Sequence, residues 1–164
     1  NMSGRLKYIL REEKGLVYSA YIDDMYFEEI GGFTIVTQTE TTQLLKKGGV
    51  LETIIDILKS LIKKGITKEE LQTVKGTIEG DNILSLQSNS NRCLYNGENF
   101  LYNQDLKHVI PYSDVYDKVF KNITKNQVDK VINKYFTPEN MSVCVVGEKI
   151  PNMQNIKKVC EKLF

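Results

Sequence analysis

Residues 5–20 read RLKYILREEKGLVYSA, a pattern that predicts a helix followed directly by a strand. Apolar side chains recur on one helical face, and Gly15 supplies a helix stop because glycine readily adopts the left-handed backbone conformation. From residue 16 to residue 27 the chain is rich in β-branched and aromatic residues, and a second such run covers residues 33–37. Gly31 and Gly32 separate the two runs, so we expect two antiparallel strands.

Downstream of these strands the sequence indicates mostly helix. Apolar residues between Val50 and Lys64 recur at the i, i+3, i+4, i+7 spacing of one helical stripe. The capping-box spacing, a threonine followed three residues later by Glu or Gln, marks further helix starts at Thr67 and Thr124. We expect the first of these helices to continue past Ser85. The remaining predicted elements are helices from Ser113 and after Pro151, and a strand at residues 141–146.

This order of elements predicts an α+β fold in which an antiparallel sheet packs against several helices. No internal repeat or long linker divides the chain, so residues 1–164 are expected to form a single domain. Three strands are few for so many amphipathic helices and would leave a sheet edge unpaired. We therefore expect a domain that is incomplete at its N-terminus, with a sheet completed by upstream residues or by another chain. The exposed edge also favours a homodimer of the isolated piece.

The composition argues against several classes of protein. The 22 Lys and Arg against 21 Asp and Glu are too balanced for a protein that binds nucleic acid or acidic membranes by charge. The apolar stretches are far shorter than the roughly 20 residues that span a bilayer, and residues 1–16 lack the apolar region of a signal peptide. The three cysteines, odd in number and widely spaced, favour free thiols in a reducing intracellular compartment.

Few residues in the chain are suited to catalysis or metal binding. His108 is the single histidine and there is no C-x-x-C pair, so a zinc site built from this chain alone lacks the usual ligands. We predict no metal ligand and no cofactor-binding residue in the chain. Nucleophilic catalysis within it is disfavoured for the same reason, because a Ser-His-Asp or Cys-His arrangement would depend on His108.

Arg11 and Tyr18 are the candidate site residues. Arg11 falls on the last helical turn and Tyr18 at the start of the strand, so the junction can bring a guanidinium and a phenol together. Such a pair offers hydrogen-bond donors to a carbonyl oxygen or a peptide carboxylate. From the residues alone, a structural interpretation is the stronger of the two. In it, Arg11 is a surface residue favoured by the helix dipole and Tyr18 is half-buried in the sheet.

Residues 5–19 resemble the R-L-x-x-x-L-R-E-x-x-G-L-x-Y-S signature in the C-terminal half of the pitrilysin, insulinase and mitochondrial processing peptidase family of zinc metallopeptidases. The similarity continues in chain order. Residues 65–71 resemble the G-v-t-x-e-E-L helix start of that family, and residues 82–92 are similar to its l-L-s-l-E-s-t-s-x-R stretch. Residues 123–147 resemble its closing helix and strand. Gln87 departs from the pattern, because the family usually has an acidic residue there.

The resemblance implies the second half of a clamshell peptidase built from two similar α+β halves. It places the inverted H-x-x-E-H zinc site in an N-terminal half or in a partner subunit, so zinc is the implied cofactor of the intact enzyme. Arg11 and Tyr18 match the two family residues that reach the bound peptide. Their implied role is to bind the scissile region and to stabilise the negative charge that develops on its oxygen.

The implied function is thus the C-terminal, substrate-clamping domain of a zinc metalloendopeptidase, which is inactive as an isolated chain. Its expected partners are the zinc-binding half and a peptide substrate, without nucleic acid or membrane. The alternative is a non-catalytic relative that serves substrate recognition or assembly, like a processing-peptidase subunit or a core protein of respiratory complexes. A third interpretation, unrelated to the family, is a stand-alone α+β interaction module.

Overall fold

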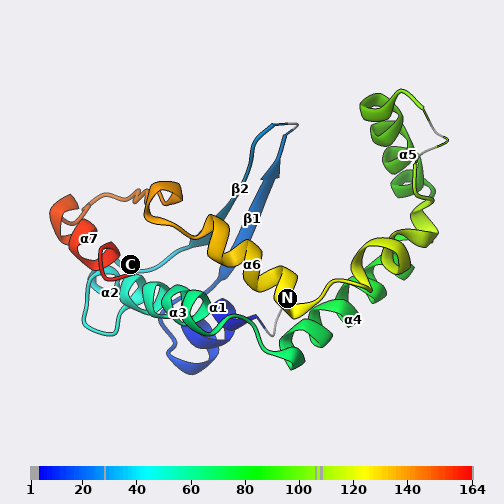
Figure 1. The fold of residues 1–164 in the computed structure, drawn as a ribbon. Helices are drawn as coiled ribbons and strands as arrows, with labels where there is room; N and C mark the ends of the chain where they lie inside the picture. The colour runs from blue at the N-terminus through cyan, green and yellow to red at the C-terminus, as the bar shows by residue number, and fades with distance from the viewer. Residues whose placement is uncertain (1–3, 28, 106, 108, 164) are drawn as a thin grey trace. The chain divides into compact units, whose positions relative to one another are not determined.

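The computed structural model describes residues 4–27, 29–105, 107 and 109–163 (Figure 1). It consists of helices and an antiparallel two-stranded sheet, which confirms the predicted α+β class. The contacts of the chain divide it into two compact units, residues 1–64 with 135–164, and residues 65–134. The single domain expected over residues 1–164 stays a prediction. Each unit is described by itself.

The first unit begins with a helix that changes its type. The α-helix α1, Arg5–Lys7, continues directly as the π-helix η1, Tyr8–Glu13. Gly15 follows with a φ of 58°, in the left-handed region that strains residues with a side chain. Immediately after it, the Leu16 amide donates a hydrogen bond of 2.8 Å to the Leu10 carbonyl. The predicted helix and its glycine stop are therefore confirmed, although the π-helical turn was not predicted.

Strands β1, Ala20–Tyr26, and β2, Gly31–Thr37, pair antiparallel, as predicted (Figure 1). The register sets Ala20 opposite Thr37 and Tyr26 opposite Gly31. Gly31 and Gly32 belong to β2, so the prediction that they separate the strands was wrong. The reason is that the backbone pairing with β1 includes both glycines, with Gly31 opposite Tyr26 and Gly32 opposite Met25.

Three helices complete the first unit: α2, Thr41–Leu44; α3, Val50–Lys64; and α7, Met153–Cys160, with a short 3-10 turn at Pro138–Asn140. The bounds of α3 are those predicted from its apolar stripe. Helices α3 and α7 pack together around a core made of Leu51, Ile55, Ile156, Cys160 and Leu163. A second cluster, Leu10, Val17, Ala20 and Val50, joins the end of η1 and the start of β1 to α3.

The strand predicted at residues 141–146 was wrong. The structure gives no strand there, and the sheet within the described part of the chain consists of β1 and β2. Met141 and Val145 pack against the core between α3 and α7, whereas Val146 is 91% exposed. Only Met141 and Val145 of this apolar segment reach the core, and an extended segment can carry such a pattern without pairing with a neighbouring strand.

The second unit contains helices α4, Lys68–Ser85; α5, Asn89–Asn103; and all but the last residue of α6, Lys125–Tyr135, with a 3-10 turn at Tyr112–Asp114 and a π-helical turn at Tyr116–Phe120. Both predicted capping boxes are present. The Thr67 hydroxyl accepts a hydrogen bond of 3.1 Å from the Glu70 amide, and the Glu70 carboxylate accepts one of 2.7 Å from the Thr67 amide. Thr124 and Gln127 make the equivalent pair at α6.

Helix α4 ends at Ser85, so its predicted continuation was wrong, and α5 was not predicted. The Arg92 guanidinium donates to the Leu86 carbonyl at 2.9 Å, which satisfies a backbone group at the end of α4. Ser88 then caps α5 by accepting from the Asn91 amide at 3.3 Å. The polar run before α5 therefore serves as a helix boundary. Across the residues described, no helix is both long enough and apolar enough for a membrane crossing.

The three cysteines differ in burial, and this predicts their reactivity. Cys93 and Cys144 are exposed free thiols, whereas Cys160 is buried between α3 and α7 and burial raises the pKa of its thiol. Because the thiolate is the reactive form, we expect a disulfide reagent to label Cys93 and Cys144 quickly and Cys160 only after denaturation. Mass spectrometry of the labelled peptides measures this. Equal labelling rates at all three positions would contradict the packing of α7 on α3.

Candidate functional site

Arg11 and Tyr18, the two site residues predicted from the sequence, lie next to each other. Arg11 is in the last turn of η1, and the carbon at the centre of its guanidinium lies 5.3 Å from the centre of the Tyr18 ring. This separation is within the range of a cation–π contact. The Arg11 side chain is 41% exposed, and its Nε lies 3.7 Å from a Glu12 carboxylate oxygen. A ligand can therefore reach the guanidinium from solvent.

Tyr18 is more accessible than the structural interpretation of the sequence required. It lies two residues before β1 begins and is 83% exposed, so the expectation of a tyrosine half-buried in the sheet was wrong. The strand starts later because backbone pairing with β2 begins at Ala20. The neighbouring Val17, in contrast, is buried, at 7% exposure. The chain therefore anchors itself through Val17 and presents the phenol of Tyr18 outward.

The helix that carries Arg11 is fixed on its inner side. Leu10 is fully buried against Val17, Ala20 and Val50. At the end of the helix the Lys14 ammonium donates to the Thr53 hydroxyl of α3 at 2.9 Å. The Thr53 hydroxyl in turn lies 3.3 Å from the Gly48 carbonyl, to which it donates. These contacts hold the end of η1 on α3 and leave Arg11 on the outside.

Two further threonines hold the segment that carries Tyr18. The Thr37 hydroxyl donates to the Ser19 carbonyl at 2.9 Å, and the Thr39 hydroxyl donates to the Leu16 carbonyl at 3.1 Å. The sequence analysis missed both residues, as it missed Thr53. A threonine that bonds a backbone carbonyl 18 or 23 residues away has no local sequence signature.

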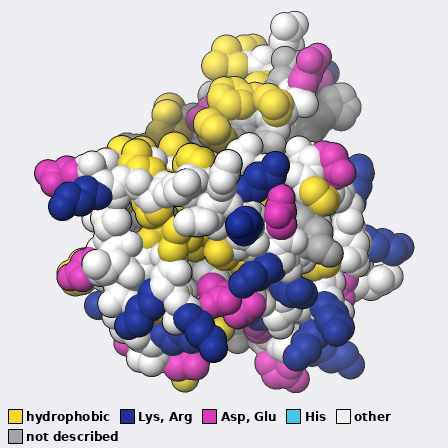
Figure 2. All heavy atoms as spheres, turned by 90° about the vertical axis from the view of Figure 1, so that its left-hand side faces the viewer, with side chains coloured by type: hydrophobic (Ala, Val, Ile, Leu, Met, Phe, Trp, Pro, Cys, Tyr) yellow, Lys and Arg dark blue, Asp and Glu magenta, His cyan; other side chains and the backbone are white. Residues whose placement is uncertain are grey.

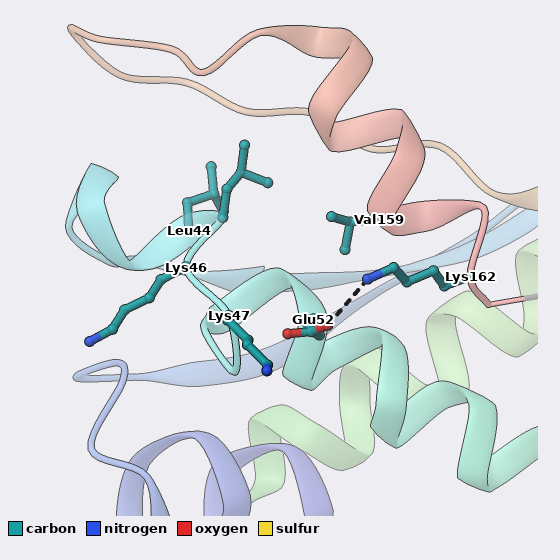
Figure 3. Close-up of a pocket in the computed structure, with 7 residues that line it drawn as sticks. Leu44, Lys46, Lys47, Glu52, Val159 and Lys162 are labelled. Atoms are coloured by element: carbon teal, nitrogen blue, oxygen red, sulfur yellow. Dashed lines mark hydrogen bonds and ion pairs between the residues drawn. The ribbon is translucent and has the colours of Figure 1, made fainter.

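A pocket of about 310 Å³ lies elsewhere in the first unit, and Arg11 and Tyr18 do not line it (Figure 3). Its lining consists of lysines, one carboxylate and aliphatic side chains: Leu44, Leu45, Lys46, Lys47, Glu52, Val159 and Lys162. Glu52 accepts from the Gly48 amide at 2.6 Å and pairs with the Lys162 ammonium at 3.2 Å. These two partners hold the pKa of the Glu52 carboxyl below its usual value. The pocket is basic overall, and the sequence analysis did not predict it.

Large apolar side chains are exposed on the β1–β2 hairpin. They are Tyr21, Ile22, Met25, Tyr26, Phe27, Ile30 and Phe33. Figure 2 shows one face of the molecule, where apolar side chains (yellow) reach the surface beside lysines and arginines (dark blue). Patches of this kind are typical of surfaces that contact a partner. The predicted partners, including a homodimer, stay predictions.

The described residues form no group of three or more histidine, cysteine, aspartate or glutamate side chains that could hold a metal ion. His108, the single histidine of the sequence, lies outside the described residues. The part of the chain that the structure describes therefore does not fit a zinc ion, and Arg11 and Tyr18 stay the candidate site residues.

Residues 1–78 match the sequence model of the family described as the peptidase M16 inactive domain. The matched region contains Arg11, Tyr18, the hairpin and the threonines that hold the Tyr18 segment. It also contains α3 and the first part of α4. The match therefore includes both candidate site residues.

Individual proteins are also similar to the chain. The uncharacterized zinc protease YmxG of Bacillus subtilis is 39% identical over 101 residues, which are 62% of this chain and 24% of that protein. The uncharacterized zinc proteases Mb2805c of Mycobacterium bovis and Rv2782c of Mycobacterium tuberculosis are each 30% identical over 91 residues, 56% of this chain and 20% of each relative. The chain thus spans a quarter or less of the length of these relatives.

Proposed function

We propose that this chain clamps peptide substrate in a zinc-dependent metalloendopeptidase, because its residues 1–78 match the model of the peptidase M16 inactive domain. The observation that carries the proposal is the contact between the Arg11 guanidinium and the Tyr18 ring at 5.3 Å, with both groups open to solvent. The names of the relatives, zinc proteases, support the class of reaction.

The chemistry of the pair suits the carbonyl oxygen of a peptide group. The guanidinium supplies positive charge and several N–H donors, and the phenol supplies one O–H donor. Both are most valuable where negative charge develops during hydrolysis, because fixed donors stabilise that charge without reorganisation. The ring contact also holds the guanidinium in place before the peptide arrives. In this proposal Arg11 and Tyr18 orient the scissile group and lower the barrier to its hydrolysis.

Zinc belongs to the intact enzyme in this proposal, where it supplies the Lewis acid of the peptidase reaction. Since the described residues do not fit the metal, its ligands would come from an N-terminal half or a partner subunit. The isolated chain is then expected to be inactive. The exposed apolar side chains of the hairpin support the presence of such a partner.

The proposal is tested by replacing Tyr18 with phenylalanine in the intact, zinc-loaded protein. This change keeps the ring beside Arg11 and removes the O–H donor. We expect kcat for a quenched fluorescent peptide to fall about tenfold, the loss that corresponds to one hydrogen bond to a charged oxygen. Tyr8→Phe is the matched control, because Tyr8 is an exposed tyrosine on the same helix that carries Arg11.

An unchanged kcat in Tyr18→Phe would remove the assigned role of the phenol. If the intact zinc-loaded protein cleaves no peptide at all, the non-catalytic alternative, a subunit for substrate recognition or assembly, replaces the proposal. The binding of unfolded peptides by that protein would then be the property to measure.

A further inference from the structure

We propose that Thr37 and Thr39 are positioning residues that hold Tyr18 in the orientation needed to bind substrate, an inference that rests on the proposed function. Neither hydroxyl contacts Tyr18 itself. They act on the backbone carbonyls on either side of it, two residues before and one residue after. The two threonines therefore hold the phenol through the backbone that carries it.

The two contacts hold the backbone before and after Tyr18 in the chain. Thr39 donates to the Leu16 carbonyl at 3.1 Å, and Thr37 donates to the Ser19 carbonyl at 2.9 Å. The two donors are two residues apart on one short segment at the end of β2, so they form a clip with a fixed spacing. The Leu16 amide is held as well, by the Leu10 carbonyl at 2.8 Å.

The sheet alone does not fix this segment. Backbone pairing between β1 and β2 begins at Ala20 and Thr37, so its ladder stops short of Tyr18. On the other side lies Gly15, whose left-handed conformation ends the helix. Residues 16–19 thus connect a helix to a strand without belonging to either, and the two threonine hydroxyls supply side-chain hydrogen bonds across that gap.

The phenol depends on its backbone for precise placement, because the ring is exposed. At 83% exposure the ring has little packing of its own to restrain it, apart from the guanidinium of Arg11. A displacement of about 1 Å of a group that orients substrate can reduce turnover by roughly 10²-fold. Loss of the clip is therefore expected to affect kcat through the position of Tyr18, even though the fold keeps its core clusters.

The experiment uses the intact, zinc-loaded protein with the double variant Thr37→Val/Thr39→Val. Valine keeps the β-branched shape and removes the hydroxyl. We expect kcat for peptide hydrolysis to fall about tenfold, and hydrogen exchange of the amides in residues 16–19 to become faster. Thr37→Ser/Thr39→Ser, which keeps both hydroxyls, should restore kcat. Thr34→Val is the control, because Thr34 is an exposed threonine of the same strand.

A second measurement separates positioning from general stability. In a Tyr18→Phe background, the two valines should lower kcat by much less than in the unchanged protein, because they act through the phenol that is already absent. A purely structural role would instead give the same fold-change in both backgrounds, and that result would overturn the inference.

The outcomes also distinguish this inference from the proposed function. If Tyr18→Phe lowers kcat but Thr37→Val/Thr39→Val does not, the proposed function stands and the positioning role is wrong. If Tyr18→Phe leaves kcat unchanged, the proposed function fails at Tyr18, and the positioning role fails with it. Unchanged hydrogen exchange in residues 16–19 of the double valine variant would show that the clip does not hold the segment.

Discussion

Replacing Arg11 with alanine in the intact, zinc-loaded protein is expected to lower kcat for peptide hydrolysis by about 10²- to 10³-fold. The change removes both the positive charge and the N–H donors that face solvent beside Tyr18. Zinc content should stay the same, because arginine is not a usual zinc ligand and the described residues form no group of three or more side chains that could hold a metal ion. Peptide turnover and the zinc-to-protein ratio are measured on the same sample.

A conservative variant and a control accompany the test of Arg11. Arg11→Lys keeps the charge but loses the planar fork of donors, so its kcat should lie between those of the unchanged protein and Arg11→Ala. Lys7→Ala removes a cation from α1, one helical turn earlier, and should leave kcat unchanged. Hydrolysis by Arg11→Ala at the original rate, with full zinc content, would overturn the assignment of this residue.

Replacing Ile156 with alanine is expected to destabilise the first unit by about 2–5 kcal/mol. Ile156 is 2% exposed and packs from α7 into the core that α3 provides, with Leu51 and Ile55. Truncating it removes buried methyl and methylene groups and leaves a cavity between the two helices. Urea unfolding followed by circular dichroism measures the free energy of unfolding.

Val146 provides the control for this core variant. It is 91% exposed, so Val146→Ala should change the free energy of unfolding by less than about 0.5 kcal/mol. Equal effects of Ile156→Ala and Val146→Ala would show that α7 does not share a core with α3.

The sequence predicted best the features that depend on neighbouring residues. The stripe from Val50 to Lys64 and the capping boxes at Thr67 and Thr124 are local patterns, and the structure has each of them. The strand at residues 141–146 failed because an apolar run is not enough to form a strand, which also requires a paired neighbour. Helix α5 was missed because its cap, Ser88, lies in a run of polar residues that resembles a loop.

The candidate site was predicted in part for the same reason. Arg11 and Tyr18 are seven residues apart across a glycine stop, so the end of the helix and the turn at Gly15 suffice to bring them together. The hydroxyls of Thr37, Thr39 and Thr53 reach the site from β2 and α3, and such distant hydrogen bonds depend on the complete fold. Residue type alone could not single out these threonines from the others in the chain.

Because η1 is a π-helix, the number of residues near Arg11 matters for the site as much as their identity. The Lys14 amide bonds to the Ile9 carbonyl, five residues earlier, so this turn holds one residue more than an α-helical turn. An α-helix turns by about 100° per residue, so losing one residue here would rotate the flanking side chains relative to one another. Leu10 could then not stay in the core while Arg11 faced Tyr18. An insertion or deletion between Tyr8 and Gly15 would therefore separate Arg11 from Tyr18 even with both residues still present.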